Sequence, residues 1–154
     1  MDGRTIDGAL RACPVTRGMF RGVLPADARA PCPSLAGFYV YNTDEAHEPG
    51  QHWVAQHRQP DVTRHFDSYG LPPFGALARG TLAEDCGPVR YSATRLQGSG
   101  KTCGHFCLYY ALFCADPDTY PMTVFSSRDF ERNDEVVVRL TRSVYGGLIE
   151  HCCT

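Results

Sequence analysis

Short apolar runs, broken repeatedly by Gly and Pro, extend along the whole chain. Four segments rich in aromatic and β-branched residues, or alternating apolar with polar positions, predict β-strands: 37–42, 52–57, 62–67 and 88–93. The segment 58–61, Arg-Gln-Pro-Asp, lies between the second and third of these and carries residues that favour a turn. We therefore expect segments 52–57 and 62–67 to form a hairpin.

Four other segments favour helices. Short helices are expected at 5–13, before Pro14, and at 73–81. The segment 103–114 is apolar nearly throughout and lacks Pro, which predicts a buried helix. A last helix is expected over 133–145, with Asn133 or Asp134 as its N-cap and Gly146 at its end. This order of elements predicts an α+β fold, and the length of 154 residues predicts one domain, 1–154.

Composition narrows the class of protein. The chain is 43% hydrophobic and 21% charged, as in globular domains, and its formal charge of −2 argues against a strongly basic nucleic-acid binder. No apolar run approaches the ~20 residues of a membrane span. Acidic residues at the N-terminus argue against a signal peptide. We therefore expect the eight cysteines to be mostly reduced thiols in a reducing compartment.

The predicted hairpin brings a histidine to a carboxylate. A register that places residue 57 opposite residue 62 also places His52 opposite Asp67 on one face, and Trp53 opposite Phe66 on the other. A carboxylate there can hold one imidazole nitrogen and leave the other free to act as a base. The alternatives are an ordinary cross-strand ion pair, or His65 as the base, because His65 lies on the same predicted face.

Cys103 begins the predicted buried helix, directly after a polar, glycine-rich segment, 97–102. A thiol at a helix N-terminus is favoured as thiolate, the form that attacks carbonyl carbon. The amides at the helix start can receive the negative oxygen of a tetrahedral intermediate, and the side-chain amide of Gln97 is a second candidate donor. The alternative is that Cys103 is simply a small core residue.

These residues resemble a known family. The segments 42–44, 50–53, 66–70 and 97–107, with the motifs Gly50-Gln51-His52-Trp53 and Phe66-Asp67-Ser68-Tyr69-Gly70, resemble the adenovirus protease (adenain) family. The form is closest to the versions in Polinton-type mobile elements and related animal DNA viruses. The wider group includes the SUMO-specific proteases, which share the chain order His, Asp, Gln, Cys. The resemblance covers about residues 20–115; we recognise nothing beyond about residue 119.

The resemblance implies a permuted papain-like fold, with a mixed sheet flanked by helices and the nucleophile at the N-terminus of a buried helix. It implies His52 as general base, Asp67 as the residue that orients it, Gln97 as an oxyanion donor and Cys103 as nucleophile. One departure is Asp67, where adenoviral members can have Glu, and this should not change the role. The implied activity is a thiol endopeptidase that cleaves capsid and other virion precursor polypeptides in Gly-Gly-x or Gly-x-Gly contexts.

The resemblance also suggests cofactors and a location, although the chemistry itself requires no cofactor. Adenoviral members take a disulfide from an activating peptide in the loop that corresponds to Cys86, although an ordinary loop thiol is the simpler interpretation. They also use DNA, so a phosphate-binding strip is a hypothesis for the C-terminal arginines, against a solvated helix face: Arg128, Arg132, Arg139 and Arg142. We expect a monomer in the virion and the host cell nucleus.

Two other functions remain open. The first is a ubiquitin- or SUMO-like isopeptidase that uses the same four residues. The second is a non-catalytic virion binding module that keeps the fold without catalysis. Two further motifs carry little weight. The Gly-Lys-Thr at 100–102 lacks the first glycine of a P-loop, since position 95 is Arg95. The spacings of the cysteines, including Cys152 and Cys153, match no structural zinc pattern, and we expect no metal.

Overall fold

The computed structural model describes residues 1–28, 36–48, 50–81 and 87–149. Its strands and helices, in chain order, are α1 (Gly3–Ala12), β1 (Phe20–Leu24), β2 (Gly37–Asn42), β3 (Trp53–Arg58), β4 (Thr63–Phe66), α2 (Gly75–Thr81), β5 (Val89–Tyr91), α3 (Cys103–Ala115) and α4 (Phe130–Tyr145). Two short 3-10 helices, η2 (Met122–Val124) and η3 (Gly146–Leu148), flank α4. Within the described residues, no helix has both the length and the apolar character needed to cross a bilayer.

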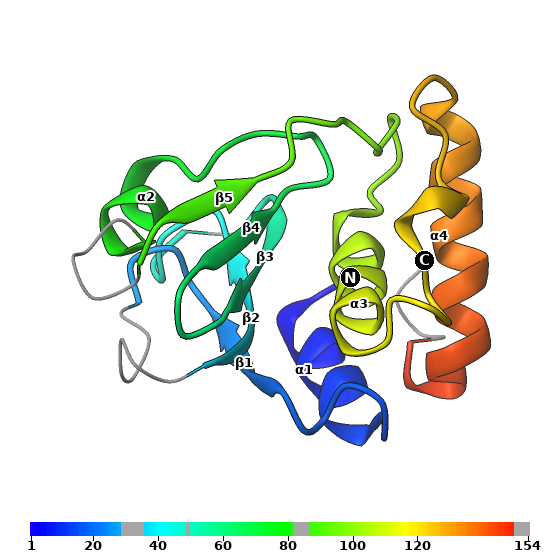
Figure 1. Ribbon diagram of the computed structural model, residues 1–154, viewed down its shortest axis with the longest axis horizontal. Helices are drawn as coiled ribbons and strands as arrows, with labels where there is room; N and C mark the ends of the chain where they lie inside the picture. Colours follow the sequence, from blue (N-terminus) through cyan, green and yellow to red (C-terminus); the bar gives the residue numbers. More distant parts are fainter. Residues whose placement is uncertain (29–35, 49, 82–86, 150–154) are drawn as a thin grey trace.

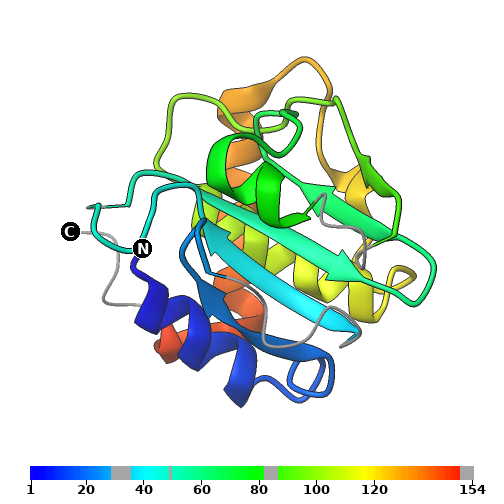
Figure 2. The same cartoon turned by 90° about the vertical axis from the view of Figure 1, so that its left-hand side faces the viewer.

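The elements form layers around a mixed sheet. The five strands lie in the order β1-β2-β3-β4-β5, with β1–β2 and β4–β5 parallel and the two inner pairs antiparallel. Helix α2 lies on one face of the sheet, α1 and α3 cover the other face, and α4 packs outside α3 (Figure 1). Figure 2 shows the sheet from the α2 side, with α3 behind it.

The main core lies between the sheet and α3. The first ten residues of α3 are all buried, so this helix is apolar on every side and is covered by the sheet, α1 and α4. The Tyr110 ring stacks on the Phe66 ring of β4, with centroids 4.3 Å apart and an interplanar angle of 10°. This packing fixes the start of α3 relative to the ends of the strands.

The predicted fold class is confirmed: helices flank a mixed sheet, and Cys103 begins a buried helix. The elements at 5–13, 37–42, 73–81, 88–93 and 103–114 are all present, with ends that differ by at most two residues. The extent of the domain, residues 1–154, stays a prediction.

The predicted hairpin register is wrong by two residues. Ala55, not Trp53, lies opposite Phe66, and Arg58 lies opposite Thr63. The reason is the turn: the Gln59 N–H donates to the Val62 carbonyl at 2.9 Å, so Val62 closes the turn and does not pair within the ladder. A shift of two residues keeps every side chain on its predicted face, because side chains alternate with a period of two.

The last helix begins earlier than predicted. Helix α4 starts at Phe130, and its N-cap is Asp129, whose carboxylate accepts the Arg132 N–H at 3.1 Å. Asn133 and Asp134, the predicted caps, lie inside the helix and are buried. Their side chains bind other parts of the chain, as described below.

A tight turn at residues 67–70 joins β4 to the loop that follows. The Gly70 N–H donates to the Asp67 carbonyl at 2.9 Å, and Gly70 has a φ of +73°. A Cβ atom at Gly70 would lie 2.8 Å from the Ala93 carbonyl oxygen and from the Thr94 carbonyl carbon. The turn therefore requires glycine twice, for its left-handed conformation and for the close approach of neighbouring backbone.

We predict that Gly70→Ala lowers the free energy of unfolding by about 1–3 kcal/mol, because the backbone at 93–94 leaves no room for a methyl group. Urea denaturation measures this change. Gly8→Ala is the matched control: Gly8 lies on an exposed part of α1, and a Cβ atom there would have no neighbouring atom within 4 Å, so alanine should gain up to about 1 kcal/mol. Equal unfolding midpoints for the two variants would contradict this account of the turn.

Candidate active site

His52 and Asp67 lie at the ends of β3 and β4, one residue beyond each strand. In the observed register His52 would face Tyr69, so His52 and Asp67 are diagonal rather than directly opposed neighbours. Their side chains still meet: the His52 Nε2 lies 2.9 Å from the Asp67 Oδ1. The predicted contact is therefore present, through a different register from the one predicted.

Asp67 is held by its own turn. Its side chain is fully buried, and its Oδ1 accepts the Tyr69 backbone N–H at 2.7 Å in addition to the His52 ring. The Tyr69 ring in turn packs on the His52 imidazole, with centroids 5.1 Å apart. A carboxylate fixed in this way orients one face and one nitrogen of the imidazole.

Cys103 completes the arrangement from the start of α3. The Cys103 side chain is hydrogen-bonded to His52, and the backbone N–H groups of Trp53 and Gly104 also point to the sulfur. Because Nε2 of His52 is bound to Asp67, Nδ1 is the ring nitrogen left to face the thiol. Three segments distant in sequence thus converge on one sulfur atom.

The electrostatics of the pair favour charge separation. Burial alone would raise the pKa of the Cys103 thiol, but the hydrogen bond from His52 and those from Trp53 and Gly104 outweigh it and lower that pKa. Burial would likewise lower the pKa of His52, but its bonds to Asp67 and Cys103 raise that pKa to about 9. At neutral pH these shifts favour a thiolate beside an imidazolium, the form in which cysteine attacks carbonyl groups.

Gln97 lies in the loop before α3 and is 2% exposed. Its Oε1 accepts the Ser68 hydroxyl at 2.6 Å, and its Nε2 donates to the Gly100 carbonyl. One of the two Nε2 hydrogens is thus used within the loop, which leaves the other for a further acceptor. The structure places Gln97 in the loop leading to Cys103, and its role as an oxyanion donor stays a prediction.

His65, the predicted rival base, does not join the arrangement. It is 3% exposed, and neither of its ring nitrogens has a hydrogen-bond partner among the described residues. Burial lowers the pKa of His65 to about 4, so it is neutral. Cys107, one turn after Cys103, is fully buried, and burial raises its pKa well above the ordinary value, which agrees with its prediction as a core residue.

Sequence patterns alone gave no role to Tyr69 or to the N-terminal residues. Besides packing on His52, Tyr69 lies under the Arg95 guanidinium, which is 5.7 Å from its ring centroid. The Trp53 indole N–H donates to the Met1 carbonyl at 3.0 Å, which ties the start of α1 to the site. Tyr69 lies in the quoted Asp67-Ser68-Tyr69-Gly70 motif, which is the one signal that could have found it.

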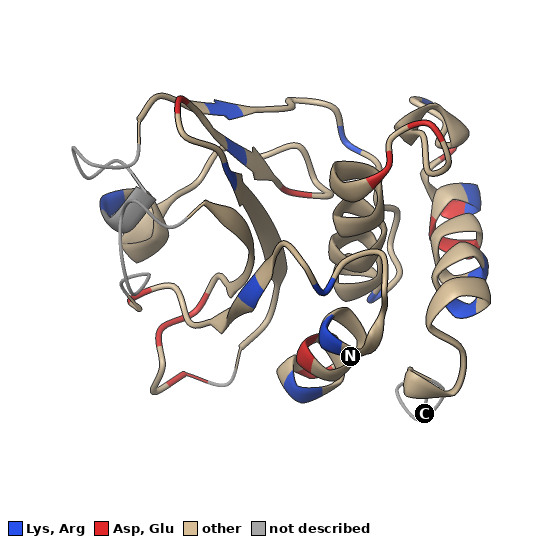
Figure 3. Ribbon diagram, turned by 60° about the horizontal axis from the view of Figure 1, so that its bottom comes forward, with Lys and Arg blue, Asp and Glu red and all other residues tan. Residues whose placement is uncertain are grey.

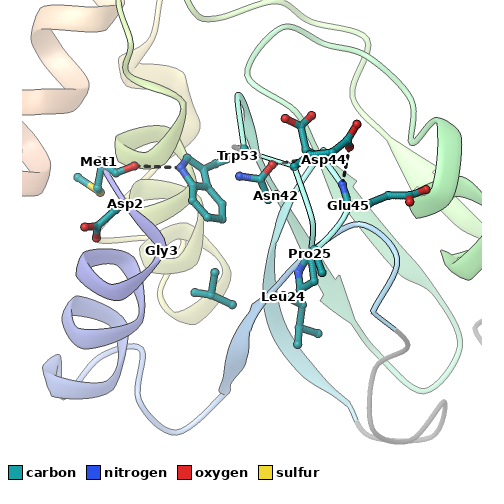
Figure 4. A pocket seen from close by; sticks show the side chains of 13 residues that line it. Met1, Asp2, Gly3, Leu24, Pro25, Asn42, Asp44, Glu45 and Trp53 are labelled. Atoms are coloured by element: carbon teal, nitrogen blue, oxygen red, sulfur yellow. Dashed lines mark hydrogen bonds between the residues drawn. The ribbon is translucent and has the colours of Figure 1, made fainter.

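Two hollows are lined in part by sequence neighbours of the site residues, Trp53 in one and Phe66 and Leu96 in the other. A cavity of about 620 Å³ opens beside Trp53, and its lining includes Asp2, Asp44, Glu45 and Glu48 (Figure 4). A groove of about 540 Å³ runs between β4, β5 and the end of α3, and its lining includes the aromatic rings of Phe66, Tyr91, Tyr110, Phe113 and Phe125. Both are large enough to hold segments of a peptide.

Several other predicted features stay untested. Cys86, Cys152 and Cys153 lie outside the described residues. Arg128, Arg132, Arg139 and Arg142 are all exposed on or near α4, where acidic residues are interspersed with them (Figure 3). Such exposure fits both a solvated face and a phosphate-binding strip. Among the described residues, no group of three or more His, Cys, Asp or Glu side chains is arranged to hold a metal ion.

We predict that iodoacetamide modifies Cys103 at neutral pH faster than the described thiols of Cys107 and Cys114, whose pKa values burial raises. Iodoacetamide reacts with the thiolate and not with the protonated thiol. The rate at Cys103 should therefore stay high at neutral pH and fall only when the pH drops through the lowered pKa of Cys103. Peptide mapping by mass spectrometry measures the rate at each site.

The same assay tests the partner of the thiol. In His52→Ala, the midpoint of the pH–rate profile of Cys103 should shift to higher pH, toward the pKa of about 8.5 of a free thiol. The control His57→Ala changes a half-buried histidine of β3, the strand that begins directly after His52, and should leave the profile in place. A Cys103 profile that is the same in all three chains would disprove the proposed coupling to His52.

Comparisons with known proteins give similarity to solved structures alone. No protein-family model matches the chain, and no curated protein matches it. Among solved structures, the chain is similar to the crystal structure of the selenomethionine form of the ASFV pS273R protease, with 22% sequence identity and a TM-score of 0.43. The match covers 75% of this chain and 45% of that chain, so the chain spans less than half of that protease.

Proposed function

We propose that the chain is a cysteine endopeptidase in which Cys103 is the nucleophile, His52 the general acid and base, and Asp67 the residue that orients the imidazole. The observation that supports this most is the continuous hydrogen-bonded chain Cys103–His52–Asp67, in which Asp67 is buried and His52 is held by two partners. Thiol proteolysis requires a base in contact with the nucleophile and a third group that orients the base, and His52 contacts both Cys103 and Asp67.

The mechanism follows from these positions. The Cys103 thiolate attacks the carbonyl carbon of the scissile peptide bond, and the carbonyl oxygen becomes an oxyanion. The amides at the start of α3 and the remaining N–H of Gln97 receive that oxyanion. The His52 imidazolium donates its proton to the departing amine, and the neutral imidazole then takes a proton from water, which attacks the thioester and releases the acid product.

The finer proposal concerns the substrate. The resemblance to adenain-like proteases supports precursor polypeptides of a virion as substrates, cleaved next to glycine in Gly-Gly-x or Gly-x-Gly contexts. The same resemblance supports action in the virion and the nucleus, and stimulation by DNA or an activating peptide.

Peptide cleavage tests the proposal. Fluorogenic peptides with Gly-Gly-x and Gly-x-Gly sites are compared with matched peptides that carry leucine at the glycine positions. We expect cleavage of the glycine peptides only. Cys103→Ala should lower kcat by about 10⁶-fold, the scale seen when a protease nucleophile is removed. Cys114→Ala, the same substitution near the other end of α3, should retain kcat.

Each other outcome has a definite meaning. Turnover retained by Cys103→Ala would show that another group is the nucleophile. Equal cleavage of the leucine peptides would reject the glycine specificity and leave the endopeptidase. Release of a fluorophore from a ubiquitin- or SUMO-like modifier, with no peptide cleaved, would instead indicate an isopeptidase. A Cys103 that neither turns over nor alkylates rapidly would indicate a non-catalytic module.

A further inference from the structure

The loop that leads to Cys103 is held by side chains of α4, a helix to which the sequence resemblance does not extend. The N-terminal end of α4 lies beside this loop, residues 96–102 (Figure 1). Asn133 Nδ2 donates to the Leu96 carbonyl at 3.0 Å, and the Glu131 carboxylate accepts both the N–H and the hydroxyl of Ser99. The contacts join residues 32 to 37 positions apart in the chain.

Asp134 makes the most protected of these contacts. It is 7% exposed, its Oδ2 accepts the Gly100 N–H at 2.9 Å, and its Oδ1 accepts the Thr102 hydroxyl at 2.5 Å. Hydrogen bonds to a charged acceptor are about twice as strong as neutral ones. Glu131 is exposed, so water and ions weaken its bonds to Ser99. Asp134 is therefore the dominant contact between α4 and the loop.

Two glycines make room for these carboxylates. A Cβ atom at Gly100 would lie 2.8 Å from Asp134 Oδ2, and one at Gly98 would lie 2.7 Å from Glu131 Oε1. A side chain at either position would displace the carboxylate that binds the loop. Glycine at 98 and 100 is thus matched to the acidic residues of α4.

The bond to Asp134 also affects the start of α3. Thr102 is the N-cap residue of α3, yet its side chain makes no capping hydrogen bond, and its ψ is 4° instead of the extended value usual at an N-cap. Its hydroxyl instead points to Asp134. The first amides of α3 therefore have no acceptor from the cap side chain. Apart from the Gly104 N–H, which points to the Cys103 sulfur, they stay available to a negative oxygen at Cys103.

We propose that Asp134 is a positioning residue for proteolysis: through Thr102 and Gly100 it holds the loop and the first amides of α3 in the geometry that receives the oxyanion. This inference rests on the proposed endopeptidase function. Asp134 does not touch the reacting atoms. Its effect should appear in the chemical step, where a small displacement of a donor is costly, and not in substrate binding.

The test compares kcat, KM and the iodoacetamide rate of Cys103 among variants of the full chain. Asp134→Ala should lower kcat by about 10²-fold, with KM and the alkylation rate unchanged, because the Cys103–His52 pair is not touched. Asp134→Asn keeps an acceptor and a polar partner for Thr102 and should recover most of kcat. Glu135→Ala, which removes an exposed carboxylate from the same helix, should match the unaltered chain.

Thr102→Val provides a second variant in case Asp134→Ala does not fold. It removes the hydroxyl with little change in size and should also lower kcat with KM retained. Unfolding temperatures show which variants are folded at the assay temperature.

Three results would overturn the inference and leave the proposed function intact: an unaltered kcat in folded Asp134→Ala or Thr102→Val, a rise in KM in place of the fall in kcat, or a failure of Asp134→Asn to recover activity. An unaltered chain that neither cleaves peptides nor alkylates rapidly at Cys103 would overturn both the inference and the proposed function.

Discussion

The hydrogen bond between His52 and the Cys103 thiol is the contact on which the chemistry of this chain depends. It joins the start of β3 to the start of α3, and it forms only because the sheet, the turn after β4 and the buried helix are packed together. Asp67 makes no hydrogen bond to the sulfur itself. Its contribution is to hold the imidazole with Nε2 engaged, so that Nδ1 faces the thiol.

The partly buried His52, just before β3, and the buried His65 of β4 show how hydrogen-bond partners decide the charge of an imidazole. Burial disfavours the imidazolium form of both His52 and His65. His52 has a carboxylate and a thiol as hydrogen-bond partners, and its pKa rises to about 9. Among the described residues His65 has no such partner, and its pKa falls to about 4. The protein thus keeps one histidine charged and the other neutral within the same small region.

Local patterns predicted much of this site, and the limits of the prediction have physical causes. The His52–Asp67 contact was correctly predicted because side-chain alternation survives a register shift of two residues, even though Trp53 and Phe66 do not pair. The predicted start of α4 was wrong because Asn133 and Asp134 are residue types that favour an N-cap, whereas here their side chains bind a loop more than 30 residues away in the chain. Nothing in the local sequence distinguishes these two uses of the same residue types.

The protonation state of His52 at neutral and mildly alkaline pH tests the thiolate–imidazolium pair most directly. Nitrogen-15 NMR of the imidazole, with His52 assigned by its absence in His52→Ala, measures that state as a function of pH. The account predicts that His52 keeps its proton until about pH 9 and that Cys103→Ala lowers this value, since the thiolate is then lost. Titration of His52 near pH 6.5, the value for an unperturbed histidine, would contradict it.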